Sequence, residues 1–161
     1  MTKISTDIAQ LDRMDRAILR ILQTEGRLPN ADLAERVHLS ASACHRRVAR
    51  LEAKGVIRGY AALLEPRAVG RRSTVFVEIT LQGQTTDNLE AFEAQVARIP
   101  DVMECHLMAG TADYLLKIIA RDADDFARIH REHLSRLPGV AQMHSSFSLK
   151  QVTSITALPL D

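Results

Sequence analysis

The first third of the chain places its apolar residues at helical spacing and predicts three helices. The first helix follows Asp12, its predicted N-cap, and its apolar face consists of Leu11, Ile18, Ile21 and Leu22. A short second helix begins near Asn30, another good capping residue, and a third runs from Ser40 to Lys54. His38 lies in the tight turn between them, where His tolerates a positive φ better than a β-branched residue does.

The residues after the third helix predict its end and then a linker. Gly55 stands where a C-cap glycine ends a helix, and residues 56–64 have the extended character of a short strand. Residues 65–72 contain Pro66 and Gly70 without periodicity, which is typical of a linker. We therefore expect a three-helix, winged helix-turn-helix domain over residues 1–64 and a linker over residues 65–72.

The remaining residues, 73–161, alternate between strand and helix patterns. We expect strands over residues 75–81, 102–108, 114–120 and 140–152, one helix from about Thr86, and a second helix capped by Asp122. The order βαββαβ predicts a ferredoxin-like domain, in which an antiparallel sheet carries both helices on one face. The chain as a whole is then an α+β protein with two domains.

The predicted strands carry apolar side chains on both faces of the sheet. Phe76, Leu115 and Ile119 alternate with the apolar residues that would face the helices. A sheet with helices on one face only should show polar side chains on the other. A second copy of the domain is the simplest cover, so we expect a homodimer built through residues 73–161.

Composition and charge narrow the class of protein. The chain has 161 residues, of which 46% are hydrophobic and 25% charged, as in globular proteins. No apolar run approaches the roughly 20 residues of a membrane span, and the start lacks the apolar core of a secretory signal. Two cysteines make a poor disulfide framework, which favours a reducing compartment. We therefore expect a cytoplasmic protein without a membrane partner.

The positive charge is concentrated in the first part of the chain. Residues 1–65 hold 11 Lys and Arg against 8 Asp and Glu, a net charge of +3. Residues 66–161 hold 10 against 12, a net charge of −2. Only the first part therefore has the charge that contact with phosphates requires.

The third predicted helix separates an apolar stripe from a basic face. Its apolar stripe, which faces the other two helices, consists of Cys44, Val48 and Leu51 at i, i+4 and i+7. On or near the opposite face lie Ser42, Arg46 and Arg50, with His45 and Arg47 on the flanks. An arginine can form two hydrogen bonds with a guanine edge or bind a phosphate, and serine hydroxyls near a helix N-terminus can donate to phosphate oxygens.

This pattern favours DNA binding over a merely solvated basic face. The solvated face is the ordinary explanation of an amphipathic helix. The short second helix, the tight turn and the serine-capped basic third helix together form the helix-turn-helix signature. We expect Ser42, Arg46 and Arg50 to read the groove, with His45 beside them, and Ser40 and Arg47 to contact the DNA backbone.

Residues 11–66 closely resemble the N-terminal half of the Lrp/AsnC family, the feast/famine regulators of bacteria and archaea. The matching elements are Leu11-Asp12 with Asp15, Leu39-Ser40, Cys44, Arg47-Val48, Arg50-Leu51-Glu52, Gly55-Val56-Ile57 and Gly59-Tyr60. The C-terminal half is similar to the family's ligand-sensing domain. Departures are few: Glu65 stands where the family often has aspartate, and Val69 where it often has leucine.

The resemblance implies a sequence-specific DNA-binding transcriptional regulator that is not an enzyme. It implies that a small effector, an amino acid, modulates DNA binding or assembly, and that homodimers assemble further into tetramers or octamers. Twofold symmetry would place two recognition helices about one helical turn of DNA apart, or a multiple of that. The double-stranded operator should then be a pseudo-palindrome.

A candidate effector site lies in the loop between the second and third strands of the rear domain. The loop consists of Met108, Ala109, Gly110, Thr111, Ala112 and Asp113, and Tyr114 enters the next strand. Turn chemistry alone explains its glycine and its carboxylate. Backbone N–H groups of residues 110–112 could also hold a carboxylate while Asp113 accepts an ammonium group, as a zwitterionic amino acid requires.

The family resemblance favours the effector function of this loop, because Gly110, Asp113 and Tyr114 match the family's effector loop. We therefore expect Met108, Gly110, Thr111, Ala112, Asp113 and Tyr114 to bind the effector. His106 and Glu104 are further residues that could line the pocket.

Other interpretations have weaker support. Two adjacent Cys-His pairs look like metal ligands, Cys44-His45 and Cys105-His106, but adjacent residues point apart on a helix or a strand. The pair His130 and His133 shares a helix face but lacks the Cys/His framework of a metal site. We expect no metal and no cofactor. Sirohaem decarboxylases also look like this family, and a Soret band would favour such an enzyme. A stand-alone amino-acid sensor is the other alternative, which a gel shift on the protein's own promoter region would distinguish.

Overall fold

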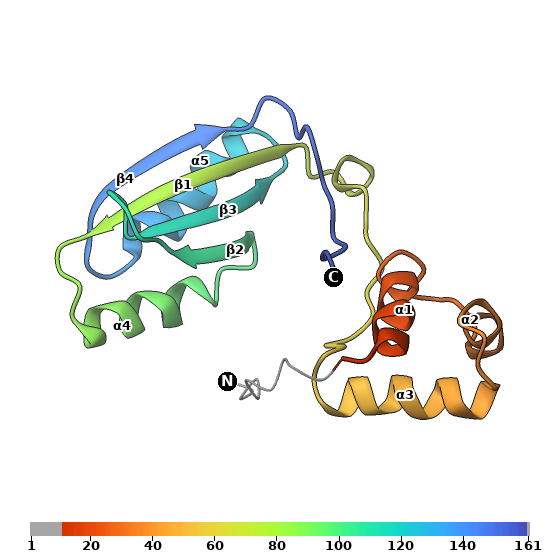
Figure 1. Ribbon diagram of the computed structural model, residues 1–161. Coiled ribbons are helices and arrows are strands. Elements are labelled where there is room, and N and C mark those ends of the chain that lie inside the picture. Colours follow the sequence, from red (N-terminus) through yellow and green to blue (C-terminus); the bar gives the residue numbers. More distant parts are fainter. Residues whose placement is uncertain (1–10, 161) are drawn as a thin grey trace. The chain divides into compact units, whose positions relative to one another are not determined.

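The computed structural model describes residues 11–160, so residues 1–10 of the expected N-terminal domain lie outside the described part. The chain forms two compact units (Figure 1). Of the described residues, the helical unit comprises 11–63 together with 153–160, and the sheet unit comprises 64–152. None of the described helices is both long and apolar enough to cross a membrane.

Three helices surround one apolar core in the helical unit. They are α1 (Arg13–Leu22), α2 (Asn30–Arg36) and α3 (Ala41–Ala53). The buried residues of this core are Ile18, Leu19, Leu33, Ala34, Val37, Cys44 and Leu51. The apolar stripes predicted for the first and third helices therefore face the same core, and the expected helix-turn-helix is present.

The helix ends follow the predicted local signals. The Asp12 carboxylate accepts hydrogen bonds from the N–H groups of Met14 and Asp15, both at 2.8 Å. Ser40 accepts one from the N–H of Ala43 at 3.3 Å. His38 has a φ of 55° and Gly55 a φ of 71°, the left-handed conformation expected in the turn and at the C-cap.

Two predictions for the helical unit were wrong. Asn30 does not cap α2, since its side-chain amide donates to the carbonyl of Ala41 at 2.9 Å and so joins the start of α2 to the start of α3. The strand expected within residues 56–64 is not formed. A strand requires a hydrogen-bonded neighbour, and no other described residue pairs with this segment.

The sheet unit has the predicted βαββαβ order (Figure 1). Its strands are β1 (Ser73–Leu81), β2 (Val102–Leu107), β3 (Tyr114–Ala120) and β4 (Val140–Phe147), and its helices are α4 (Thr86–Val96) and α5 (Ala123–Glu132). The strands lie in the order β2-β3-β1-β4, and all their pairings are antiparallel. The last strand is shorter than the predicted 140–152, because its register with β1 ends at Phe147 and only the N–H of Ser148 bonds further, to the carbonyl of Thr74 at 2.9 Å.

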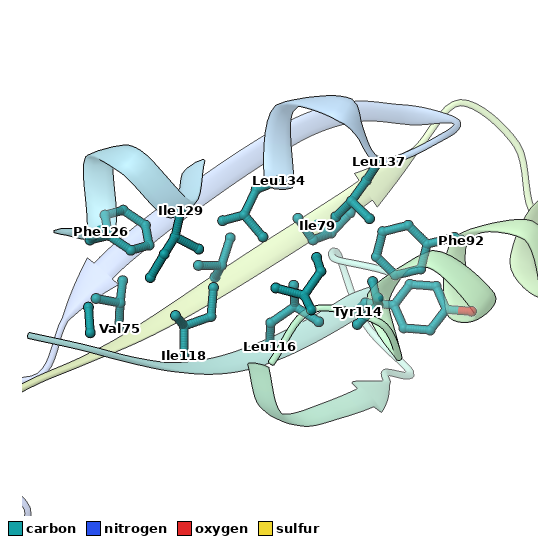
Figure 2. Close-up of a cluster of buried hydrophobic side chains, with 14 of the residues drawn as sticks. Val75, Ile79, Phe92, Tyr114, Leu116, Ile118, Phe126, Ile129, Leu134 and Leu137 are labelled. Carbon is teal, nitrogen blue, oxygen red and sulfur yellow. The ribbon is translucent and has the colours of Figure 1, made fainter. Parts of the chain in front are cut away.

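Alternate residues of the central strands form the core beneath both helices (Figure 2). Val75 and Ile79 of β1 and Leu116 and Ile118 of β3 are fully buried. Helix α4 contributes Phe92 and Val96, α5 contributes Phe126 and Ile129, and the following turn contributes Leu134 and Leu137.

On the opposite, open face, Phe76 is 38% exposed and Leu115 and Ile119 are half-buried. Both faces therefore carry apolar side chains, as the sequence pattern indicated.

The segment before β1 is ordered by local bonds. Residues Pro66–Val69 form a single 3-10 turn, η2, which ends at Gly70 with a φ of 77°. Arg71 then forms ion pairs with Asp101 at 2.9 Å and Asp125 at 3.6 Å. Hydrogen bonds from Arg121 and Arg128 surround the buried Asp125, and the bond from Arg121 contributes most to lowering the pKa of its carboxyl. The second part of the expected linker is thus anchored to the sheet unit.

Leu116 and Leu149 allow a matched test of the core. Leu116 is fully buried, whereas Leu149 is 99% exposed. We expect Leu116→Ala to lower the free energy of unfolding by about 2 to 5 kcal/mol, because it removes buried methyl groups and leaves a cavity. Leu149→Ala should change it by less than about 0.5 kcal/mol. Urea unfolding followed by circular dichroism, at one protein concentration, measures both, and equal losses would contradict this core.

Candidate DNA interface and effector loop

Helix α3 presents an exposed face opposite its buried stripe. Ser42, His45 and Arg46 are exposed, and Arg46 points away from the buried Cys44 because two residues span about 200° of a helix. Within residues 11–160, neither His45 nor Arg46 has a hydrogen-bonded or ionic partner. These two side chains are therefore available to an external acceptor.

The other two arginines of α3 are bound to α1 through a buried carboxylate. Arg47 donates to Asp15 Oδ1 at 2.8 Å and to Asp12 Oδ2 at 2.6 Å. Arg50 donates to Asp15 Oδ2 at 2.6 Å. The Asp15 side chain is only 1% exposed, whereas those of Arg47 and Arg50 are 30% and 47% exposed. One aspartate therefore holds two of the three arginines predicted to contact DNA.

This cluster has electrostatic and structural effects. The hydrogen bond from Arg47 is the main cause that lowers the pKa of the Asp12 carboxyl. Asp15 also accepts the backbone N–H of Asp12 at 3.3 Å, which completes the capping box of α1. A buried carboxylate is stable only when it is paired, so α1 and α3 are fixed to each other at this point. The sequence analysis did not predict that Asp15 pairs with α3. The equal spacing of Asp12 and Asp15 and of Arg47 and Arg50, three residues in each case, was a signal for this pairing.

The serines at the start of α3 bond mainly within the helix. The Ser40 hydroxyl accepts from Ala43 and lies 3.3 Å from the Ser42 hydroxyl. Both residues are exposed. Their hydroxyls lie beside the N–H groups of the first turn, the end of a helix that favours anions.

The loop between β2 and β3 is a hairpin with free backbone donors. The N–H of Met108 donates to the carbonyl of Asp113, and the N–H of Asp113 donates to the carbonyl of Ile79, both at 2.8 Å. Between these bonds, the N–H groups of residues 109–112 have no acceptor among the described residues. They are therefore available to an anionic group.

The two ends of this loop are held from within the sheet unit. Asp113 is 7% exposed, and its carboxylate accepts from the N–H of Leu81 at 2.7 Å and from the side chain of Gln84 at 2.5 Å. Tyr114 is 1% exposed and its hydroxyl donates to Glu93 of α4 at 2.8 Å. Burial is the main cause that raises the pKa of Tyr114. These side chains point into the unit rather than along the outer surface of the loop.

A hollow of about 360 Å³ adjoins the loop on the open face of the sheet. It is lined by Glu78, Thr80, Thr111, Ala112, Gln142 and His144. Thr111 and Ala112 are thus the predicted effector residues that line it, whereas Met108 and Gly110 are exposed elsewhere on the loop. Glu104 binds Lys117 at 2.7 Å and His106 at 3.2 Å, outside this hollow. The exposed carboxylate of Glu78, which sequence reasoning missed, is the one acid that lines it.

The described residues thus combine a helix-turn-helix that has a free basic face with a βαββαβ unit that has a hollow beside a donor-rich loop. This combination defines a class of protein, the ligand-responsive transcriptional regulators. Comparison with known proteins agrees with both parts. Residues 11–58 match the model of a winged helix-turn-helix DNA-binding domain, and residues 74–158 match that of the Lrp/AsnC ligand binding domain.

Relatives and solved structures cover nearly the whole chain. The leucine-responsive regulatory protein of Salmonella typhimurium is 44% identical over 88% of this chain and 87% of its own length. The structure of a Neisseria meningitidis transcriptional regulator in complex with L-methionine is 39% identical, with a TM-score of 0.89 over 94% of this chain and 98% of that one. A Mycobacterium tuberculosis feast or famine regulatory protein, also with L-methionine, is 33% identical, with a TM-score of 0.81 over 90% of this chain and 96% of that one.

The chain belongs to the Lrp/AsnC family of transcriptional regulators. The predicted family, fold class and regulatory function are confirmed by these comparisons. Because the relatives are regulators, the prediction that the chain is not an enzyme is confirmed as well.

Asp15 and Asp12 provide a matched test of the cluster between α1 and α3. We expect Asp15→Asn to lower the free energy of unfolding by about 1 to 3 kcal/mol, because a buried acceptor of two charged hydrogen bonds is weakened. Asp12→Asn keeps a good N-cap and loses one half-exposed ion pair, so it should cost no more than about 1 kcal/mol. Urea unfolding monitored by helical circular dichroism compares the two, and a larger loss for Asp12→Asn would contradict the central position of Asp15.

Proposed function

We propose that the chain recognises a pseudo-palindromic DNA operator through α3 and that an amino acid modulates its DNA binding or assembly. The first part rests on Arg46, which is exposed at the centre of the outer face of α3 and has no ionic partner within residues 11–160. Ser42 and His45 flank it on the same face and complete the groove-reading set.

The remaining basic and hydroxyl groups suit phosphate contacts. Arg47 and Arg50 keep part of their guanidinium groups exposed while they are bound to Asp15, so each can still bind a phosphate oxygen. Arg50, which the sequence pattern predicted to read a base, is therefore assigned to the DNA backbone instead. Ser40, at the N-terminus of α3, is placed for the same kind of contact.

Dimerisation through the sheet unit would supply the twofold symmetry of the operator. The open face carries Phe76, which is 38% exposed, with Leu115 and Ile119 beside it. A second copy would cover these side chains, and dimers would assemble further into tetramers or octamers. In this proposal residues 1–64 bind DNA, residues 65–72 link the domains, and the protein acts in the cytoplasm. Of the expected rear domain, residues 73–161, the part up to Val152 senses and oligomerises, while the segment after it joins the helical unit.

The effector site is the loop of residues 108–114 with its adjoining hollow. The free N–H groups of residues 109–112 would hold the carboxylate of the amino acid. Asp113 keeps the loop in shape, and any contact with an ammonium group would add to the bonds it makes with Leu81 and Gln84. Glu78 offers an exposed carboxylate inside the hollow. L-Methionine is the first probe, because two structural relatives are methionine complexes.

Arg46→Ala tests the DNA interface. If Arg46 reads a base, the variant should lose about 1 to 3 kcal/mol of binding free energy and relax specificity at one or two operator positions. Arg98→Ala removes an equal charge from an exposed site of the sheet unit and should leave the binding free energy nearly unchanged. Affinity selection of DNA fragments, followed by gel shifts at one salt concentration, measures both. A uniform loss across sequences would assign Arg46 to a phosphate instead.

Ala112→Leu tests the effector loop. A larger side chain at Ala112 intrudes into the hollow, so we expect the affinity for L-methionine to fall at least about tenfold, equivalent to 1.4 kcal/mol. Ala109→Leu makes the same change at an exposed loop position outside the hollow and should bind as the wild type does. Calorimetry measures the affinity, and gel shifts without methionine check that both variants still bind DNA. Equal affinities in both variants would contradict this site.

A further inference from the structure

The helical unit is completed by the end of the chain. Residues 153–161 belong to it, although the whole sheet unit separates them from residues 1–63 in the sequence. The polypeptide therefore passes between the two units twice, once after Leu63 and once after Val152. The second passage follows β4, which ends at Phe147.

The backbone of this tail is bound by polar side chains of α1. The Gln23 side chain donates to the carbonyl of Leu158 at 3.1 Å and accepts from its N–H at 2.6 Å. One amide side chain thus pairs with both backbone groups of one residue, as a neighbouring strand would. Arg20 adds a hydrogen bond to the carbonyl of Leu160. Pro159, between them, has no N–H that needs a partner.

The tail lies along an apolar groove of the helical unit. The groove has a volume of about 610 Å³ and is lined by Leu19, Leu22, Val56, Ile57 and Tyr60, together with the tail residues Leu158 and Leu160. Leu160 packs against the core of the unit. Apolar walls with an amide and a guanidinium at the rim suit an extended, uncharged peptide, and residues 153–160, Thr-Ser-Ile-Thr-Ala-Leu-Pro-Leu, carry no charged side chain.

We propose that this groove is the docking site of the chain's own C-terminal segment, residues 157–160, and that the docked segment holds the end of α3 in place. The residues after α3 form one wall of the groove. Val56 and Ile57 both donate their N–H groups to the carbonyl of Leu51, at 2.9 and 3.2 Å, so the same residues cap α3 and line the groove beside the tail. The tail thereby connects β4 to the helix that carries Arg46. This docking does not depend on whether the effector is an amino acid.

Hydrogen–deuterium exchange of the full-length chain tests the docking. Three variants disturb it: a chain that stops after Ala157, Gln23→Ala, and Leu160→Ser. We expect exchange of residues 55–61 to rise about tenfold in the shortened chain and less in the two substitutions, because the groove loses the tail that forms one of its walls, or the clamp that holds the tail. Ile155→Ala changes a tail residue that is 77% exposed and does not line the groove, and it should exchange as the wild type does.

The outcomes separate docking from its alternatives. Circular dichroism checks that the shortened chain remains folded. If its residues 55–61 exchange at the wild-type rate, the proposal is overturned. Leu160→Ser measures the same loss without shortening the chain, so a folding defect of the truncation does not decide the result.

Chemical cross-linking tests whether the tail docks on its own chain. Thr24→Cys and Pro159→Cys place two exposed thiols near the clamp while Gln23 and Leu158 stay intact, and Cys105→Ser removes the exposed native thiol. With a short bismaleimide, we expect a cross-linked species that runs as a single chain on a denaturing gel. A species of twice the mass would mean that the tail of a second copy fills the groove, and it would overturn the proposal.

Discussion

The surface that α3 offers to DNA depends on the buried carboxylate of Asp15. Removing a charge from water costs several kcal/mol unless partners replace the water, and both Asp15 oxygens are bonded to arginines. Arg47 and Arg50 thereby become part of the packing between α1 and α3. Arg46, one residue away, has no such partner among the described residues and remains free for an external ligand. The buried acid thus distinguishes two arginines with fixed positions from one that has no internal partner among the described residues, all on a single helix.

Asp113 uses the same principle in a different way. It is nearly as buried as Asp15, but its partners are an N–H and an amide, which carry no charge. These bonds fix the end of the hairpin and leave the preceding N–H groups without internal acceptors. The loop therefore combines a buried negative charge with outward donors. That combination favours the proposed anion contact through backbone N–H groups over one in which two side chains hold the ligand directly.

Local signals predicted the elements well because helix caps and alternation act over a few residues. Asp12, Ser40 and Gly55 marked helix ends that the structure reproduces, and β3 has its predicted limits. The pairing of Asp15 with Arg47 and Arg50 joins residues 32 and 35 positions apart. The equal spacing of the two acids and the two arginines indicated such a pairing, but no local pattern fixes which residues meet.

Where side chains point was predictable in one case and not in another. Tyr114 shares the two-residue period of Leu116 and Ile118, so its burial followed from the strand pattern. The family resemblance nevertheless led to its prediction as an effector-binding residue. The extent of β4 could not be obtained in this way, because alternation continues past Phe147, whereas the paired register with β1 does not. The clamp of Gln23 on Leu158 spans 135 positions and leaves no trace in the local pattern.

The two passages of the chain between the units differ in how they are held. The second half of the first passage belongs to the sheet unit, since Arg71 is paired with Asp101 and Asp125. Residues 61–64, just before it, make no hydrogen bond with any other residue in the range 11–160. The second passage ends in the clamp at Gln23. Residues 149–157 of the second passage, between Ser148 and the clamp, likewise make no hydrogen bond with any other residue in the range 11–160. In the proposed regulator, coupling between effector and DNA therefore has two routes, the linker and the docked tail, and both are held at their ends rather than along their length.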